Sequence, residues 1–282
     1  MLSVVHTETV GGVAQPLPVT SSNAAVAWRD LLEGAAKSWI WTALAIQDIR
    51  LRYRGSVLGP FWLTISMLVM AGAMGLIYSR LFGVDAKTYL PFLVTGLVVW
   101  QFISAIVTEG CDTFLRAQSV IQQIPMPFSI HVYRTVCRNL LVLAHSFVVI
   151  PIGLVVFRLA VGWHVLETAA GLAVLALNGV WISILLGMLS ARFRDIPPIV
   201  ANFMQIGFFI TPIFWPIDAL GDWKPIAALN PLFAAIDVVR APLLGNGVSA
   251  TSWIVLLGTT LLGCGVTFAL FARFRTRIAY WI

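Results

Sequence analysis

The stretch "IRLRYRGSVLGPFW", residues 49–62, decides the fold because it joins a charged segment to a long run without charge. Arg50, Arg52 and Arg54 precede its first glycine, and no Asp, Glu, Lys or Arg follows until Arg80. A helix needs about 20 apolar residues to cross the hydrocarbon core of a membrane, and this run is long enough. The arginines at its start either anchor a membrane helix or contact something that passes it.

The composition extends this interpretation to the whole chain. Of 282 residues, 59% are hydrophobic and 11% are charged, and the mean hydropathy is +0.91. Soluble domains are about 45–50% apolar and about 25% charged. The sequence therefore predicts an integral membrane protein. Its net charge of +6 is then a signal of membrane topology, and no nucleic-acid partner is expected. The cysteines and histidines show no metal-ligand spacing, so no metal site is predicted.

Charge-free runs recur along the chain and set the predicted topology. We predict an all-α protein with six membrane spans at residues 57–79, 89–108, 139–157, 168–191, 196–217 and 248–272. With both chain ends on one face, most of the 18 Lys and Arg residues lie on that face. The positive-inside rule makes this face cytoplasmic. A seventh span would move Arg273, Arg275 and Arg277 outside and weaken the bias, so six spans are favoured.

Residues 218–247 form the predicted outer segment. They are apolar in part, but Asn230 and Pro231 split them, and Asp237 and Arg240 would be costly in mid-bilayer. We predict two short re-entrant helices here, between the fifth and sixth spans.

The residues before the first span carry a different pattern. Residues 1–23 have neither the basic start nor the apolar block of a signal peptide, and we expect a disordered tail. The distribution of apolar and charged residues along 24–54 predicts an amphipathic helix in the cytoplasmic interface, with Trp28 and Trp39 on its apolar face. The pattern fails at Arg50, where the helix should bend or end. The remainder, 55–282, is then the transmembrane domain.

We find no pattern of residues that indicates catalysis. The phosphate-binding motif G-x-x-x-x-G-K-[ST], H-E-x-x-H and G-x-S-x-G are all missing from the sequence, so no enzyme activity is predicted. The predicted spans hold too few ionisable groups for ion-driven transport. Energy for transport should then come from another subunit. The predicted cytoplasmic loop 109–135 is either a solvated connector or a docking element for such a partner.

Five stretches, in this order, resemble the permease subunits of ABC-2 type polysaccharide exporters, which move O-antigen, capsule or teichoic acid. They are "DIRLRYRGSVLGPFW", "QQIPMPFSI", "ARFRDIPPIV", "FFITPIFWP" and "LNPLFAAIDVVRAPLL". The resemblance covers residues 28–282. It implies a homodimer in a bacterial inner membrane, with both termini cytoplasmic. It also implies two copies of a separate ATPase, which would bind ATP and Mg; this chain itself would hold no cofactor.

The resemblance also implies roles for individual residues. A coupling helix at about 113–123 and a second cytoplasmic loop would contact the ATPase through Thr113, Phe114, Arg116, Gln118, Gln122, Pro127, Arg192, Arg194 and Asp195. An outer gate would use Pro212, Pro216, Asn230, Pro231, Asp237 and Arg240.

The implied cargo is a glycan on a lipid carrier such as undecaprenyl diphosphate, moving among membrane lipids. Guanidinium groups bind phosphate in a bidentate way, so Arg52 and Arg54 are candidates to receive the diphosphate. Sugar rings stack on aromatic rings, which makes Trp62, Phe208, Phe209 and Trp215 candidate channel residues. Anchoring by the arginines and lipid contact by the aromatic residues are the alternatives. An ABC-2 exporter of a small lipid-like molecule or drug, a membrane glycosyltransferase and a recruiting scaffold remain open as functions.

Overall fold

The computed structural model describes residues 23–59, 61–158 and 162–282, and all regular secondary structure in these ranges is helical. The described ranges contain five helical stretches that are long and apolar enough to cross a membrane. They are α3 (Phe61–Leu81), α4 (Ala86–Cys111), α6 (Ser129–Phe147) continued by α7 (Val149–Val156), α8 (Val165–Arg192), and α12 (Ala250–Phe274) with the short η2 (Arg275–Arg277) and α13 (Ile278–Trp281). This confirms the predicted helical membrane fold.

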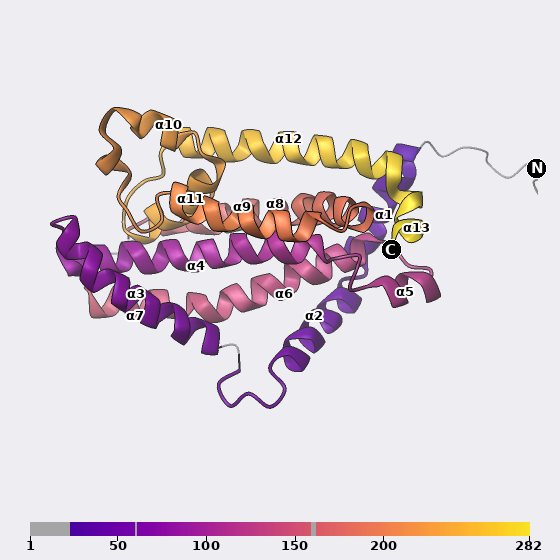
Figure 1. The fold of residues 1–282 in the computed structure, drawn as a ribbon, viewed down its shortest axis with the longest axis horizontal. Helices are drawn as coiled ribbons and strands as arrows, with labels where there is room; N and C mark the ends of the chain where they lie inside the picture. Colours follow the sequence, from indigo (N-terminus) through magenta and orange to yellow (C-terminus); the bar gives the residue numbers. More distant parts are fainter. Residues whose placement is uncertain (1–22, 60, 159–161) are drawn as a thin grey trace, which may run out of the picture.

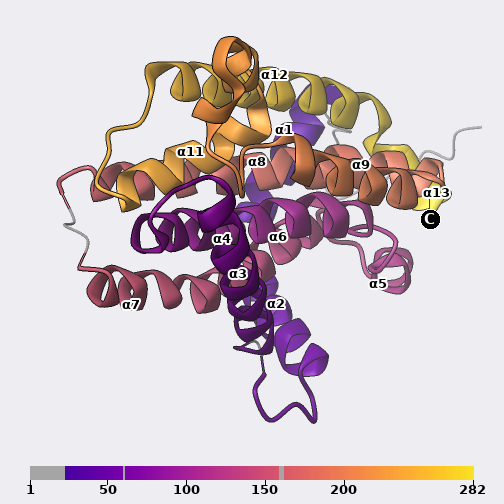
Figure 2. The same cartoon turned by 60° about the vertical axis from the view of Figure 1, so that its left-hand side comes forward.

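Figure 1 shows α4, α6, α8 and α12 running along the long axis of the molecule, with α1, α5 and α13 gathered at one end. Figure 2 shows α5, α13 and the C-terminus at that same end after rotation. We call it the basic end, because Arg275 lies there in contact with α1 through Asp30. At the opposite end, the backbone N–H of Val248, just before α12, donates to Glu167 at the start of α8 at 3.4 Å. Helices α8 and α12 therefore run in the same direction.

Helix α4 is the centre of the bundle. Its most apolar window is 61% buried, whereas the corresponding window of α3, of α6 with α7, and of α12 is 22% buried. It packs against α3, α6, α8, α9 and α11. Any residue that α4 presents to a groove is therefore held on a rigid support.

Helix α9 (Ile196–Ile210) is shorter than the predicted span 196–217. Pro212 disfavours helical backbone at the residue before it, and Thr211 is extended with ψ at 136°. The 15 residues of α9 extend about 22 Å, less than the bilayer core of about 30 Å. The end of this predicted span is thus corrected from residue 217 to Ile210.

The predicted outer segment contains η1 (Ile217–Trp223), α10 (Lys224–Ala228) and α11 (Pro231–Leu243). The chain bends by 113° between α10 and α11, at the predicted break Asn230-Pro231. Pro231 begins α11, where its missing N–H costs no hydrogen bond. Asn230 caps α11 by accepting from the N–H of Leu232, and its amide donates to Thr211 at 3.2 Å. The start of α11 therefore lies beside the end of α9.

The segment before the first span is two helices, α1 (Asn23–Ala36) and α2 (Ser38–Arg52), where a single helix was predicted. The break falls at Lys37, whose ψ is 44°. The predicted tail, residues 1–23, lies outside the described residues except for Asn23, which begins α1. Helix α2 ends at Arg52, close to the predicted end at Arg50, and the chain turns through Gly55 and Gly59 at φ of 83° and 53°. Positive φ favours glycine, which explains both positions.

The predicted cytoplasmic loop 109–135 is shorter in the structure. Helix α4 continues to Cys111 and α6 begins at Ser129, which leaves residues 112–128 as the connection. The predicted coupling helix 113–123 is reduced to α5 (Gln118–Gln123), preceded by turns. Phe114 explains the difference, because its fully buried ring packs in one cluster with Val132, Ile184 and Met188 and pulls the chain against α8.

Candidate functional site

A groove runs between α3, α4 and α9, with a volume of about 720 Å³. Polar side chains of α4 line part of it, and aromatic rings of α4 and α9 line another part. The polar residues are Gln101, Ser104 and Thr108, and the aromatic residues are Trp100, Phe208 and Phe209. Phe208 and Trp100 pack at 5.7 Å between ring centroids. The groove thus offers both hydrogen-bonding groups and ring faces to a guest.

Glu109 lies where the groove meets a second, charged cavity, and it lines both. One carboxylate oxygen accepts from Arg52 at 2.7 Å. The other accepts from Arg138 at 2.7 Å and from the amide of Asn139 at 2.9 Å. Glu109 therefore ties the end of α2 to α4 and α6.

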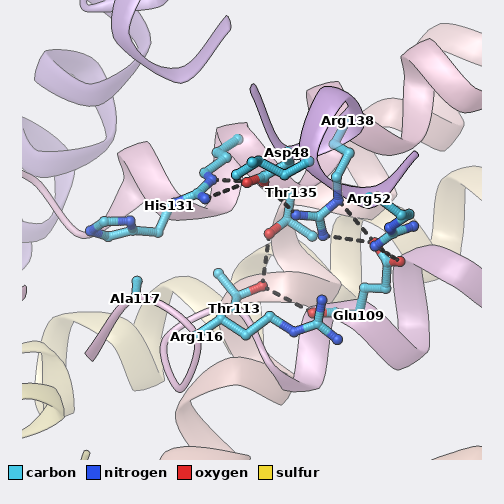
Figure 3. A pocket seen from close by; sticks show the side chains of 11 residues that line it. Asp48, Arg52, Glu109, Thr113, Arg116, Ala117, His131, Thr135 and Arg138 are labelled. Atoms are coloured by element: carbon cyan, nitrogen blue, oxygen red, sulfur yellow. Dashed lines mark hydrogen bonds and ion pairs between the residues drawn. The ribbon is translucent and has the colours of Figure 1, made fainter. Parts of the chain in front are cut away.

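The charged cavity has a volume of about 390 Å³ and lies between α2, α4, α6 and the turn after α4 (Figure 3). Asp48 of α2 accepts from Arg134 at 2.8 Å and from Arg138 at 2.7 Å. Burial alone would raise the pKa of Asp48, but hydrogen bonds and charge from Arg134 and Arg138 lower it below its usual value. Asp48 is therefore ionised at neutral pH and holds α2 against α6.

The predicted diphosphate ligands occupy different surroundings. Arg52 is paired with Glu109, so an incoming anion would have to compete with a carboxylate. Arg54 is exposed and makes no ion pair within the described ranges. Of the predicted aromatic residues, Phe208 and Phe209 line the groove. Trp62 and Trp215 are not among its described lining residues, and Trp62 is 57% exposed.

The predicted ATPase contacts divide by burial. Arg116, Gln118, Gln122, Arg192, Arg194 and Asp195 are exposed. Thr113, Phe114 and Pro127 are buried inside this chain, so they cannot contact a partner directly in this conformation. Helix α13 contacts both α5 and α8, which places α5 and the turn after α8 at the same end of the molecule.

Of the predicted gate residues, Arg240 is buried, with only 4% of its surface exposed. Its guanidinium donates to the carbonyl of Pro212 at 3.0 Å and stands 4.1 Å from the ring centroid of Phe92. Asp237, one turn earlier, accepts from Ser252 of α12 at 2.7 Å. Pro216 immediately precedes η1. Arg240 therefore fastens the bend after α9 to α11.

Five charged or titratable residues of the charged cavity were not predicted as site residues: Asp48, Glu109, His131, Arg134 and Arg138. Asp48 and Arg138 are 90 positions apart, and the sequence carries no signal that joins them. Arg134 and Arg138 are four positions apart on α6 and so share a face, which is the one pattern that could have indicated a cationic surface.

The bundle of membrane-length helices, the groove along its central helix and the exposed basic end define a polytopic helical membrane protein. The profile of the ABC-2 type transporter family matches residues 41–244, and the chain belongs to this family. It is 27% identical over 243 residues to an O-antigen export system permease protein RfbA of Klebsiella pneumoniae, covering 83% of this chain and 91% of that protein.

Two further relatives carry the same name. A second Klebsiella pneumoniae protein is 28% identical over 220 residues, which cover 76% of this chain and 83% of the relative. A Myxococcus xanthus protein is 25% identical over 210 residues, which cover 71% of this chain and 78% of the relative.

Proposed function

We propose that this chain is the transmembrane subunit of an ATP-driven exporter that moves lipid-linked polysaccharide from the cytoplasm across the bacterial inner membrane. The observation that carries the proposal is similarity along most of the chain: three proteins named as O-antigen export permeases align with 71–83% of it. The membership in a transporter family supports transport as the activity. The cargo would be a polymer of the O-antigen or capsular type.

In this proposal the chain crosses the membrane six times, and the basic end is cytoplasmic. The chain leaves α8 at the basic end and enters α12 at the opposite end, which requires an odd number of crossings between them. Helix α9 and the bend after it would supply one crossing, and η1, α10 and α11 would form the re-entrant outer gate. Helices α1 and α2 would lie at the cytoplasmic interface, where Trp28 and Trp39 are 56% and 74% exposed.

Two copies of the chain would form the channel, each contributing one groove. The groove is open on one side, and its flanks carry apolar side chains that a second copy would cover. Val69 of α3 and Phe203 of α9 are each 68% exposed. Phe208 and Phe209 would offer ring faces to the sugars, while Gln101 and Ser104 would bind hydroxyl groups.

Energy would come from two copies of a separate ATPase, which bind ATP and Mg. The exposed part of the loop after α4, with Arg116, Gln118 and Gln122, would enter the ATPase. The exposed Arg192, Arg194 and Asp195 would form the second contact. Thr113, Phe114 and Pro127 would support this loop from inside the chain.

Replacing Ala201 with Trp tests the path of the cargo. Ala201 is exposed and lines the groove from α9. A tryptophan side chain buries about 150–250 Å² and would narrow the passage, so we expect export to fall about tenfold or more. The measurement is polymer at the cell surface, with the amount of purified transporter checked in parallel. Leu261→Trp is the matched control, because Leu261 is 75% exposed on α12 and does not line the groove. Equal export by both variants would place the path elsewhere.

Reversing the charge of Arg192 and Arg194 tests the second ATPase contact. Like charges across an interface cost several kcal/mol, so Arg192→Glu with Arg194→Glu should reduce ATPase recovered through this chain about tenfold or more. The measurement is co-purification. Arg80→Glu, at the exposed end of α3, should leave recovery unchanged. Normal recovery with the doubly reversed chain would refute a contact at this turn.

A further inference from the structure

Helix α5 is too short to hold its position by itself. It has six residues, and each of them is exposed or half-buried. Isolated helices shorter than about 12–15 residues are marginal in water, so in proteins such helices are stabilised mainly by tertiary packing. The proposed ATPase contact uses this helix. Whatever packs against α5 therefore sets the geometry of that contact.

The chain after α12 packs against α5. We call residues 275–282, which form η2, α13 and Ile282, the C-terminal segment. Figures 1 and 2 both show α13 and α5 at the basic end, and the two helices are in contact. Ile278 of this segment is 0% exposed and shares a buried cluster with Phe114. Ile121 of α5 and Ile282 pack against the same cluster. The C-terminal segment therefore supplies part of the apolar surface on which α5 rests.

Polar contacts hold the loop after α4 to the same segment at two points. The side-chain amide of Gln122 in α5 donates to the carbonyl of Ile282 at 3.4 Å. At the end of the loop, Arg275 donates to Asp30 at 2.7 Å, and its guanidinium lies 5.2 Å from the ring centroid of Phe128. Asp30 also accepts from the backbone N–H of Phe128. The loop that joins α4 to α6 is therefore also held to the end of α12.

We propose that the C-terminal segment positions α5 for the ATPase and that Ile278 is the main positioning residue. This inference rests on the proposed function, in which α5 enters the ATPase. Ile278 is fully buried, so it acts on the partner only through α5. Because η2 and α13 follow α12 directly, a displacement of α5 would reach α12 through the same contacts. Helix α12 would then respond to the ATPase together with α4 and α6.

The test is hydrogen exchange of the full-length chain in phosphatidylcholine nanodiscs, measured by mass spectrometry on peptides that cover α5. Ile278→Ala removes most of a buried side chain, and we expect the α5 amides to exchange about tenfold faster or more. Ile278→Val keeps most of the volume and should exchange more slowly than Ile278→Ala. Unprotected α5 amides in the wild type, or wild-type exchange in Ile278→Ala, would overturn the positioning role.

Leu256→Ala is the matched control for general destabilisation. Leu256 is 2% exposed on α12 and belongs to the other buried cluster. It lies roughly 30 Å along the helix from Ile278. Its replacement should lower the unfolding midpoint, as that of Ile278 does, but leave α5 exchange within about twofold of wild type, because distant sites act independently. An equal increase of α5 exchange in both variants would show general destabilisation and refute the inference.

Recovery of the ATPase through this chain is the second measurement. At equal amounts of folded chain, Ile278→Ala should lower recovery about threefold or more, because a loosened contact must be ordered on binding. Ile278→Val should restore recovery, and Leu256→Ala should leave it unchanged. Faster α5 exchange with undiminished recovery would contradict the role in ATPase binding. Failure of the proposed function would look different: the wild type would recover no ATPase, although α5 exchange would still respond to Ile278→Ala.

Discussion

Replacing Asp30 with Ala is expected to lower the free energy of unfolding by about 3–5 kcal/mol, the usual cost of removing one partner of a buried charge pair. The Asp30 side chain is fully buried and accepts from Arg275. It also accepts from the backbone N–H groups of Phe128 and Ser129, at 3.1 and 3.0 Å, where α6 begins. One carboxylate thus caps α6 from another helix and holds the segment after α12. Denaturation in detergent, followed by tryptophan fluorescence, measures the change.

Glu33→Gln is the control for this experiment. Glu33 lies one turn further along α1 and forms an exposed pair with Arg29. Its removal should leave the unfolding midpoint unchanged, because exposed pairs on a helix surface contribute little. A cost for Asp30→Ala no larger than that of the control would show that α1 is not held through this carboxylate.

Replacing Arg138 with Met is expected to have the second largest effect, again about 3–5 kcal/mol. The Arg138 side chain is 7% exposed and donates to both Asp48 and Glu109 at 2.7 Å. Without Arg138, the half-buried carboxylates of Asp48 and Glu109 face the space that its side chain filled. Asp48 keeps its ion pair with Arg134, and Glu109 keeps its ion pair with Arg52. We also expect faster hydrogen exchange in α2, because Asp48 joins α2 to α6 through this arginine.

A double-mutant cycle separates the ion pair from simple packing. Arg138→Met combined with Glu109→Gln should cost less than the sum of the single changes by about 0.5–3 kcal/mol, because the second change removes a carboxylate that the first left unpaired. Arg116→Gln breaks an exposed pair on the same cavity and should cost less than about 1 kcal/mol. Strict additivity of Arg138→Met and Glu109→Gln would contradict the role assigned to this network.

The sequence predicted the helical membrane fold because the charge-free runs and the basic flanks are local signals. The break at Asn230-Pro231 was predicted for the same reason, because it follows from the backbone preference of a single residue. The resemblance to ABC-2 permeases was likewise carried by short stretches, and the family match confirms it.

The two errors in helix length have different causes, one local and one tertiary. The predicted fifth span runs past Pro212 to residue 217 because the apolar run continues, whereas α9 ends at Ile210. The predicted coupling helix at about 113–123 was what the resemblance to ABC-2 permeases implied. In the structure, Phe114 is drawn into the cluster against α8 instead. Tertiary packing therefore sets the course of the chain around Phe114. Hydrophobic periodicity in the sequence does not indicate this contact.

The charged cavity could not be predicted from the sequence because its parts come from distant segments. Arg52 and Arg54 drew attention as neighbours of the first span, but Arg52 meets Glu109, 57 positions away. His131 looked ordinary, and only its burial without a partner singles it out. Of the three opening arginines, Arg52 is therefore part of a network that links α2, α4 and α6, and membrane anchoring is at most one of its roles.

The most direct test of the central claim is the location of lipid-linked polysaccharide in cells with and without this chain. We expect loss of the chain to leave the lipid-linked polymer on the cytoplasmic side of the inner membrane. Ala201→Trp should reproduce this result, whereas Leu261→Trp should not. Undiminished polymer at the surface of cells that lack the chain would contradict it.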